Sequence, residues 1–371
     1  MSRRLVIAPG RRYGHVTIPS SKSIAHREII ASLLSGFDVR DEQIRGWSDD
    51  LKATRVCLKR MLNGKHEWPC KESGTTLRLL TPLVDVLNCD GKFIKEGRLA
   101  ERPMLDFDLR NLKNGQLTLP GDISSQFVSG VLFAAPLVSW KLDVCDHLEL
   151  KLSSPLQSAS YVKLTENILK DSGIKFSKPD DSTWIIPGWQ RYRLWQGRGV
   201  VEGDWSQAAF FVCMDVDNIK IDGLNWGSDQ GDRAVADLLT SEEIDASQIP
   251  DVIPALAAKM ASMTWTTRFT NCKRLKYKEC DRLEATCNMI NAVGGNARVE
   301  DDDTLVVVGT WPKRLRGGEV KTCGDHRIAM AAAVLANYAC GPIEIDDADV
   351  VSKSYPKFWD DFNALKVGEP I

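Results

Sequence analysis

The sequence lacks the features that mark several common classes of protein. It has ten cysteines, but no CxxC pair and no cysteine and histidine spacing typical of a metal site. It also has no GxGxxG fingerprint and no Ser-His-Asp arrangement of a hydrolase. The sequence therefore gives no sign of a metal or of an organic cofactor. Scattered cysteines are typical of reduced thiols in a cytoplasm.

Charge and hydrophobicity exclude further classes. The chain has 48 lysines and arginines against 50 aspartates and glutamates, so no overall field attracts nucleic acid or a membrane surface. The longest apolar runs, such as residues 131–138, are too short to cross a bilayer. The first nine residues lack the apolar core of a signal peptide. We therefore expect a cytoplasmic protein that binds neither nucleic acid nor membrane, and any anion site must be local.

The openings of the expected helices indicate a repeated architecture. One set of apolar helices begins with small polar residues, near Ser20, Ser73, Ser124, Trp205, Asp251 and Gly324. A second, more charged set alternates with it, over residues 49–62, 102–112, 160–170, 229–239, 279–293 and 355–365. Strand pairs follow some of these helices, most clearly at residues 175–186 and 297–308. The pattern predicts six copies of a unit of roughly 60 residues, each with two helices and several strands.

The six copies are uneven, and they fall into two domains. A chain of 371 residues is long for a single core. Residues 62–71 are too few for a hairpin, so we predict that the first copy lacks its strand pair. Short connections near Pro19 and Glu202 are the candidate domain junctions. We therefore predict one domain from residues 1–19 with 202–371, and a second, inserted domain from residues 20–201.

The stretch from Pro19 to Arg27 is the first candidate for an anion site. A proline ends an extended segment, two serines can cap a helix, and an apolar helix follows. Lys22 lies at the mouth of that helix, and Ser23 and Arg27 share one of its faces. Free N–H groups, two cations and several hydroxyls suit a phosphate or carboxylate. The alternative is a capped helix with two solvated cations.

Three further openings in the same half of the chain carry similar groups. In the segment 73–78, Gly74 lets a ligand approach the backbone, whereas Arg78 either binds a ligand or forms a structural ion pair. Arg98, in a short basic loop, could clamp a carboxylate or simply be solvated. Residues 122–127 offer more hydroxyl and amide groups than capping alone requires.

Carboxylates accompany the cations in the second half. Asp251 opens an apolar helix, where an ordinary N-cap is the alternative interpretation. Residues 276–282 combine three cations with two carboxylates before a helix that must be buried, so part of this run is expected to line a cleft. Arg327, just after the plausible cap Asp325, opposes the helix dipole, and a bound anion would offset that cost.

Together these residues predict an enzyme for phosphorylated, acidic small molecules. The candidate cations are Lys22, Arg27, Arg98, Arg282, Arg327 and Lys353. Asp251 and Glu279 lie among them, and carboxylates beside cations at helix mouths are suited to proton transfer between anionic substrates.

The ordered motifs resemble those of one known family, EPSP synthase, or 3-phosphoshikimate 1-carboxyvinyltransferase. They run in order from Pro19 to Lys353 and comprise Pro19-Ser-Ser-Lys-Ser…His-Arg27, Ser73-Gly-Thr-Thr-Leu-Arg78, Arg98…Glu-Arg-Pro-Met104, Ser124-Ser-Gln126, Val201-Glu-Gly-Asp204, Lys278-Glu-Cys-Asp-Arg282 and Asp325-His-Arg327. The resemblance implies an α/β (α+β) protein of two domains, an inside-out α/β barrel built from six βαβαββ-type units. It also implies two crossings of the chain between the domains and an active site in the cleft between them.

The resemblance implies a reaction in chorismate and aromatic amino acid biosynthesis, with no metal or cofactor. The 5-hydroxyl of shikimate 3-phosphate adds to C2 of phosphoenolpyruvate, and a tetrahedral intermediate then eliminates phosphate. By motif, the shikimate 3-phosphate residues are Lys22, Ser23, Arg27, Ser124, Ser125, Gln126, Ser158, Tyr161, Asp251 and Lys278. Those for phosphoenolpyruvate are Lys22, Gly74, Thr75, Arg98, Gln126, Arg282, Arg327 and Lys353. Asp251 and Glu279 are the expected proton-transfer groups, assisted by Lys22, and a monomer is expected.

Some positions depart from the family pattern. Arg274 stands where many members place Asn or an acidic residue that contacts the shikimate ring, and Cys280 replaces a small hydroxyl residue. Gly74 is the residue type of inhibitor-sensitive members, but Leu79 differs from the proline common nearby.

Two alternatives to this function remain open on the sequence alone. The first is the related enolpyruvyl transferase that acts on UDP-N-acetylglucosamine, which usually carries a cysteine in the loop equivalent to residues 96–101; none is present here. The second is a non-catalytic, repeat-built anion-binding protein. The carboxylates Asp251 and Glu279 argue against it, because a phosphate binder gains nothing from nearby negative charge.

Overall fold

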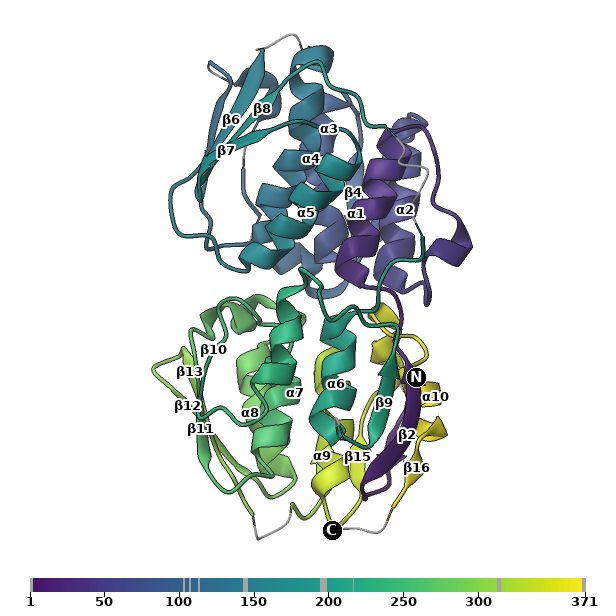
Figure 1. Ribbon diagram of the computed structural model, residues 1–371, viewed down its shortest axis with the longest axis vertical. Coiled ribbons are helices and arrows are strands. Elements are labelled where there is room, and N and C mark those ends of the chain that lie inside the picture. Colours follow the sequence, from purple (N-terminus) through teal and green to yellow (C-terminus); the bar gives the residue numbers. More distant parts are fainter. Residues whose placement is uncertain are drawn as a thin grey trace. The chain divides into compact units, whose positions relative to one another are not determined.

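The chain forms two compact units. The computed structural model describes residues 3–102, 104–106, 108–112, 114–142, 146–193, 199–215, 217–311 and 315–368. Met1–Ser21 and Glu202–Ile371 form one unit, here called the terminal unit, and Lys22–Val201 form the inserted unit. Figure 1 colours the inserted unit from purple to teal, and the terminal unit holds both ends of the chain.

The inserted unit alternates helices with short strands. In chain order its elements are α1 (Lys22–Leu34), η1 (Asp41–Gln43), α2 (Asp49–Leu62), β3 (Glu67–Lys71), α3 (Gly74–Val86), β4 (Lys92–Lys95), η2 (Gly97–Glu101), η3 (Leu109–Asn111), β5 (Gln116–Leu119), α4 (Ser125–Leu142), β6 (His147–Leu152), α5 (Ala159–Asp171), β7 (Ser177–Asp180) and β8 (Thr183–Pro187), where η marks a 3₁₀ turn.

The terminal unit begins with two strands and resumes after the insertion. Its elements are β1 (Leu5–Ile7), β2 (Arg12–Thr17), α6 (Trp205–Asp215), β9 (Ile219–Asp222), η4 (Gly231–Asp237), β10 (Glu243–Asp245), α7 (Ile253–Met260), β11 (Thr266–Thr270), η5 (Lys273–Tyr277), α8 (Arg282–Ala292), β12 (Asn296–Glu300), β13 (Thr304–Val308), β14 (Gly318–Val320), α9 (His326–Tyr338), β15 (Ile343–Ile345), η6 (Asp349–Lys353), α10 (Phe358–Ala364) and β16 (Lys366–Val367).

Each unit contains one four-stranded sheet with the same connectivity. The strand orders are β5-β6-β8-β7 and β10-β11-β13-β12. In both sheets the first two strands are parallel and joined through a buried helix, α4 or α7, and the remaining pairs are antiparallel. The same parallel pairing through a helix recurs at β3-α3-β4 and β14-α9-β15. The βαβαββ pattern is therefore complete once in each unit, as expected for an α/β protein built from repeats.

The helices expected from polar openings all form, and local side chains explain where they begin. The clearest case among the charged helices is α2, which occupies the expected residues 49–62. Ser48 accepts a hydrogen bond from the N–H of Leu51, and acidic residues in the first turn favour the positive end of the helix dipole. The expected strand pairs form as β7-β8 and β12-β13. Between α2 and α3 the chain forms only one strand, β3, so the predicted loss of the first hairpin is confirmed.

Two of the helix predictions are wrong. In the segment 102–112, only a 3₁₀ turn forms among the described residues, because the Asp85 carboxylate binds the N–H of Leu109 and the side chain of Arg110. The segment 229–239 also forms a 3₁₀ turn, η4, whose polar side chains are drawn toward the start of α6. In both segments, hydrogen bonds to residues more than twenty positions away take the place of the bonds of an α-helix.

Each unit has its own hydrophobic core around a central helix. In the inserted unit α4 buries Phe127 and Phe133 completely, and in the terminal unit the alanine-rich α9 is buried over nearly its whole length. Figure 1 shows α6 and α7 between the β10–β13 sheet and strands β2 and β9. Full burial of a large apolar side chain stabilises a fold by about 1.5–3 kcal/mol, so these helices anchor both the sheets and the helix openings. Among the described residues, no helix combines the length and the apolar character needed to span a membrane.

The chain leaves and re-enters the terminal unit through two paired segments. Ser20 and Gly203 form an antiparallel bridge, and the N–H of Ser21 donates to the carbonyl of Glu202 at 2.7 Å. The two connections to the inserted unit therefore start side by side.

Candidate functional site

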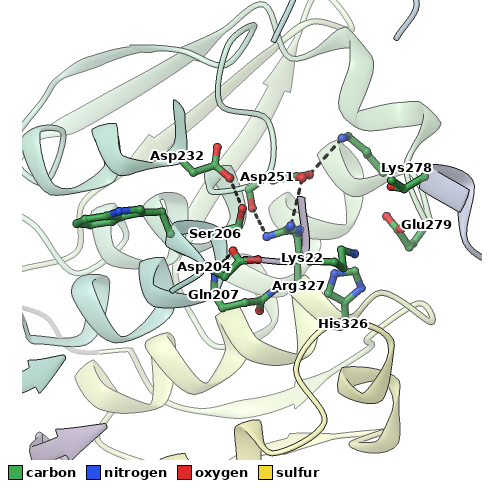
Figure 2. A network of polar contacts seen from close by, with 12 residues as sticks. Lys22, Asp204, Ser206, Gln207, Asp232, Asp251, Lys278, Glu279, His326 and Arg327 are labelled. Carbon is green, nitrogen blue, oxygen red and sulfur yellow. Dashed lines mark hydrogen bonds and ion pairs between the residues drawn. The ribbon is translucent and has the colours of Figure 1, made fainter. Parts of the chain in front are cut away.

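Asp251 is the centre of a cluster of charges in the terminal unit. Arg327 Nη2 lies 3.1 Å from Asp251 Oδ2, and Lys278 Nζ lies 3.1 Å from Oδ1 (Figure 2). Arg282 Nη1 lies 3.0 Å from the same Oδ1. Arg327 Nη1 also donates to the Asp251 backbone carbonyl at 2.9 Å. Helix α7 begins two residues later, and its N-cap residue, Val252, makes no side-chain cap. Asp251 therefore binds cations rather than capping the helix.

Arg282 connects Asp251 to two further carboxylates. Its side chain is 1% exposed, and it contacts Asp325 Oδ2 at 2.8 Å and Glu279 Oε2 at 2.5 Å. Asp325 also caps α9 by accepting the N–H of Arg327 at 2.8 Å, so its expected capping role is confirmed. Lys353 Nζ lies 3.7 Å from Glu279 Oε1. A buried ion pair must be well hydrogen-bonded to repay its desolvation, and these contacts meet that condition.

The cluster shifts the pKa values of its members in opposite directions. Burial acts to raise the pKa of Asp251, but Arg327, Lys278 and Arg282 outweigh it and hold that pKa well below its usual range. Burial is also the main reason that the pKa of Lys278 falls to about 8, although the charge of Asp251 opposes this. Asp251 is therefore ionised at neutral pH in the ligand-free protein, whereas Lys278, with a pKa of about 8, loses its charge more readily than an ordinary lysine.

The two unusual residues of this region lie in the cluster. The buried Cys280 thiol donates to Asp325 Oδ2 at 3.6 Å, and burial together with the Asp325 charge raises the pKa of that thiol. Cys280 is therefore a neutral group that fills a small site. Arg274, on η5, is close enough for its charge to help lower the pKa of Lys278.

In the inserted unit, Lys22 lies at the start of α1, as expected. Its Nζ forms an ion pair with Asp50 Oδ2 at 2.9 Å, and both side chains are largely buried. A chain of hydrogen bonds runs nearby from His26 through Thr54 to Thr76, at 2.7 and 2.6 Å. It fixes the starts of α1, α2 and α3 relative to one another.

Arg27 is a buried cation whose hydrogen bonds, within the described part of the chain, are to neutral groups. They run to the carbonyls of Ser23 and Tyr161 and to the hydroxyls of Thr165 and Ser129. Burial lowers the pKa of Arg27 to about 10, so it remains protonated at neutral pH. The structure thus brings Arg27, Ser23 and Tyr161 together. Such a charge suits an anionic ligand.

Gln126 joins the starts of α3 and α4. Its Oε1 accepts from Arg78 Nη1 at 3.1 Å, and its Nε2 donates to Thr75 Oγ1 at 2.8 Å. This contact of Arg78 is a hydrogen bond to a neutral amide, so the two interpretations of Arg78, ligand binding and a structural ion pair, both stay predictions. The buried Ser124 accepts the N–H of Gln126 at 3.3 Å, and the buried Ser125 opens α4. Ser158, just before α5, adopts a left-handed backbone with φ 54°.

Gly74 faces an arginine that sequence reasoning did not select. A Cβ atom built on Gly74 would lie 2.9 Å from Arg102 Nη1 and 3.6 Å from Arg78 Nη1. Arg98, by contrast, has a side chain that is 52% exposed and lies 3.7 Å from Glu101. Both arginines belong to the same basic segment, and only the course of the loop backbone distinguishes them.

Sequence reasoning also missed polar residues around the start of α6. Asp204 caps the helix by accepting the N–H of Gln207 at 3.0 Å, and the Ser206 hydroxyl donates to Asp232 (Figure 2). Burial, together with the charge of Asp251, raises the pKa of Asp232 to about 6. Asp204 could have been found from its motif. Asp232 lies in the 3₁₀ turn η4, and no motif in the sequence marked it as a candidate.

Comparison with known proteins identifies the family. A sequence profile of EPSP synthase (3-phosphoshikimate 1-carboxyvinyltransferase) matches residues 105–242 and 223–362. The 3-phosphoshikimate 1-carboxyvinyltransferase of Clostridium botulinum is 33% identical and that of Clostridium kluyveri 34%, each over 97% of this chain and 96% of the relative. The first alignment spans 429 positions, so the relative carries segments that this 371-residue chain lacks.

Solved structures agree on the fold. An EPSP synthase structure from Acinetobacter baumannii superposes with a TM-score of 0.72 at 20% identity, covering 99% of this chain and all of the other. A second structure from the same organism gives 0.71. The chain therefore belongs to the EPSP synthase, or 3-phosphoshikimate 1-carboxyvinyltransferase, family.

Proposed function

We propose that this chain transfers the carboxyvinyl group of phosphoenolpyruvate to the 5-hydroxyl of shikimate 3-phosphate and releases phosphate. The observation that carries this proposal is the cluster around Asp251 and Glu279. Two carboxylates are held there by four cations, and two of these cations, Arg282 and Arg327, lie in the first turns of α8 and α9. Anionic substrates need such cations, and a proton must be moved in each half of an addition-elimination reaction.

We assign the cations of the terminal unit to phosphoenolpyruvate. Arg282, Arg327 and Lys353 would bind its carboxylate and phosphate, together with Lys22, Gly74, Thr75, Arg98 and Gln126 of the inserted unit. Arg102 joins this set because its guanidinium faces Gly74. The paired donors of arginine match the planar oxygens of carboxylate and phosphate groups.

We assign the remaining predicted residues to shikimate 3-phosphate. Arg27 supplies a buried positive charge whose described hydrogen-bond partners are neutral, which favours an anionic group of the substrate. The hydroxyls and amides assigned with it are those of Ser23, Ser124, Ser125, Gln126, Ser158 and Tyr161. Lys22, Asp251 and Lys278 complete the set. Residues of both units therefore contribute to substrate binding, and we propose the two units as the two domains of the family fold.

The low pKa of Asp251 has a consequence for the proposed chemistry. While three cations surround it, Asp251 is a weak base. Anionic substrates that bind Arg327, Arg282 and Lys278 compete for the same charges, so the pKa of Asp251 rises on binding. Asp251 then accepts the proton of the 5-hydroxyl as its oxygen adds to C2, and Glu279 protonates C3, assisted by Lys22. In the second half the C–O bond to phosphate breaks and a C3 proton leaves, which restores the double bond.

Phosphate release tests this function directly. Wild-type enzyme should release phosphate only when both substrates are present. Asp251→Asn and Glu279→Gln should each lower kcat by about 100-fold or more, the usual size of an acid–base contribution. Leu62→Met, a conservative change of an exposed side chain at the end of α2, is the control and should have no effect.

Two results would contradict the proposal. Normal turnover in both carboxylate variants would exclude their proton-transfer roles. No release from the wild type would exclude the reaction and make UDP-N-acetylglucosamine the next acceptor to test.

We further propose that the enzyme acts as a monomer in the cytoplasm. The cysteines that the structure describes are all free thiols, as in a reducing compartment.

A further inference from the structure

Gln207 is a buried polar residue to which the site described above assigns no role. It lies in the first turn of α6, and only 1% of its surface is exposed. Neither Oε1 nor Nε2 has a hydrogen-bond partner in the described part of the chain. An amide buried in this way loses its hydrogen bonds to water and gains none within the protein. Native proteins rarely retain such a group unless a bound water or ligand supplies the missing partner.

Gln230, by comparison, is a buried glutamine whose side-chain amide is fully hydrogen-bonded. It is buried in the same unit, and its Oε1 accepts from the Ser21 hydroxyl and from the N–H of Trp205, at 2.9 and 3.1 Å. Its Nε2 donates to Glu202 and to the carbonyl of Gly203, at 2.7 and 2.9 Å. Both donors and both acceptor sites of the Gln230 amide are therefore used. A glutamine with a structural role in this unit is hydrogen-bonded in this way, and Gln207 is not.

The surroundings of Gln207 point to an anionic ligand. Figure 2 shows its side chain directed toward the start of α9, where His326 and Arg327 lie. Helices α6 and α9 pack against each other, and Gln207 and Arg327 each lie in the first turn of one of these helices. Their dipoles and the Arg327 guanidinium favour negative charge, and an amide Nε2 can donate to it.

We infer that Gln207 is a further substrate-binding residue, whose Nε2 donates to an anionic oxygen of the ligand that binds Arg327. The inference rests on the proposed function, which assigns Arg327 to phosphoenolpyruvate. Because phosphoenolpyruvate and the product phosphate carry the same kind of oxygen, each ligand is tested separately.

Gln207→Met keeps the size of the side chain and removes the amide. Since the lost group has no partner in the ligand-free protein, Tm should stay the same or rise. The rise in Tm that phosphoenolpyruvate produces in the wild type should shrink, and KM for phosphoenolpyruvate should increase about ten-fold or more. KM for shikimate 3-phosphate should change less than about two-fold. Inorganic phosphate, measured in the same way, shows whether the phosphate group alone is recognised.

Gln230→Met is the control, with the opposite pattern. It removes four hydrogen bonds, so Tm should fall while KM for phosphoenolpyruvate stays near the wild-type value. Gln207→Glu adds a negative charge that repels an anionic ligand, so it should weaken phosphoenolpyruvate binding at pH 8 more than at pH 5.

Two outcomes decide against the inference. If Gln207→Met lowers Tm and leaves the phosphoenolpyruvate response unchanged, the amide holds a structural water or an internal contact instead. If the variant keeps both Tm and the response to phosphoenolpyruvate, Gln207 does not contact the ligand. A wild type that binds phosphoenolpyruvate but releases no phosphate would contradict the proposed reaction alone, because the Tm response still tests Gln207.

Discussion

Two carboxylates of the terminal unit, the partly exposed Asp251 and the buried Asp232, are shifted toward opposite protonation states. Asp251 contacts three cations and remains ionised, whereas Asp232 accepts a bond from Ser206 and feels the negative charge of Asp251. The same unit therefore holds one acid with a depressed pKa and another with a pKa raised to about 6. Opposite shifts of this kind often accompany acid–base chemistry, although only Asp251 is assigned to substrate here.

The raised pKa of Asp232 predicts a pH-dependent loss of stability. An acid whose pKa is higher in the folded state than in the unfolded state stabilises the fold fully below the unfolded value, near 4. That contribution is lost as pH rises through the folded value, about 6. Asp232→Asn should therefore match the wild type at pH 4 and be more stable at pH 7. The expected gain is about 3 kcal/mol for a shift of this size.

Urea denaturation across this pH range measures the effect. Asp237→Asn, an exposed carboxylate at the end of the same 3₁₀ turn, is the control and should leave the profile unchanged. A constant difference between Asp232→Asn and the wild type at every pH would refute the assignment.

At the scale of elements, the starts of the buried helices carry the chemistry. Polar residues near Ser20, Ser73, Ser124, Asp251 and Gly324 mark these positions in the sequence, because a helix start needs groups that satisfy free N–H donors. The same donors and the helix dipole favour anions, so capping and ligand binding leave similar patterns. Contacts from distant segments are needed to separate the two roles, as for Asp251 and Asp325.

The start of α3 allows a test of close approach. Gly74→Ala adds a methyl group 2.9 Å from Arg102 Nη1, the flexible end of a side chain that can move away. Stability should therefore change by less than about 0.5 kcal/mol, as for other tolerated substitutions. The methyl group occupies space assigned to phosphoenolpyruvate, so KM for that substrate should rise about ten-fold, which is about 1.4 kcal/mol. Gly199→Ala, which meets open space, is the control for steady-state kinetics. An unchanged KM would remove Gly74 from the site.

The sequence was a good guide to helices but a poorer guide to partners. Periodicity and caps located α2 and both complete strand pairs. The segments 102–112 and 229–239 misled because their side chains bond backbone groups and distant residues instead. Asp50 and Asp232 were missed for a related reason: each acts through a residue more than twenty positions away. The role inferred for Gln207 rests on burial, which a single sequence does not reveal.

At the scale of the whole molecule, the chain has two separate hydrophobic cores, one in each unit. Phe133 on α4 and Phe210 on α6 are each fully buried in a different core. Phe133→Ala and Phe210→Ala should each cost about 3–5 kcal/mol because each leaves a cavity. Hydrogen exchange should then show lost protection mainly in the unit that carries the change. Equal loss of protection in both units would mean that the two cores unfold as one.

The paired connections at Ser20–Ser21 and Glu202–Gly203 have a topological consequence. For the terminal unit, residues 22–201 amount to one long loop between β2 and α6, anchored where its two ends leave together. Closing a loop becomes costlier only slowly as it lengthens, by about 0.6 kcal/mol for each doubling. An entire folding unit can therefore be carried between two neighbouring elements at little entropic expense, and the parallel pairing of β2 with β9 survives the interruption.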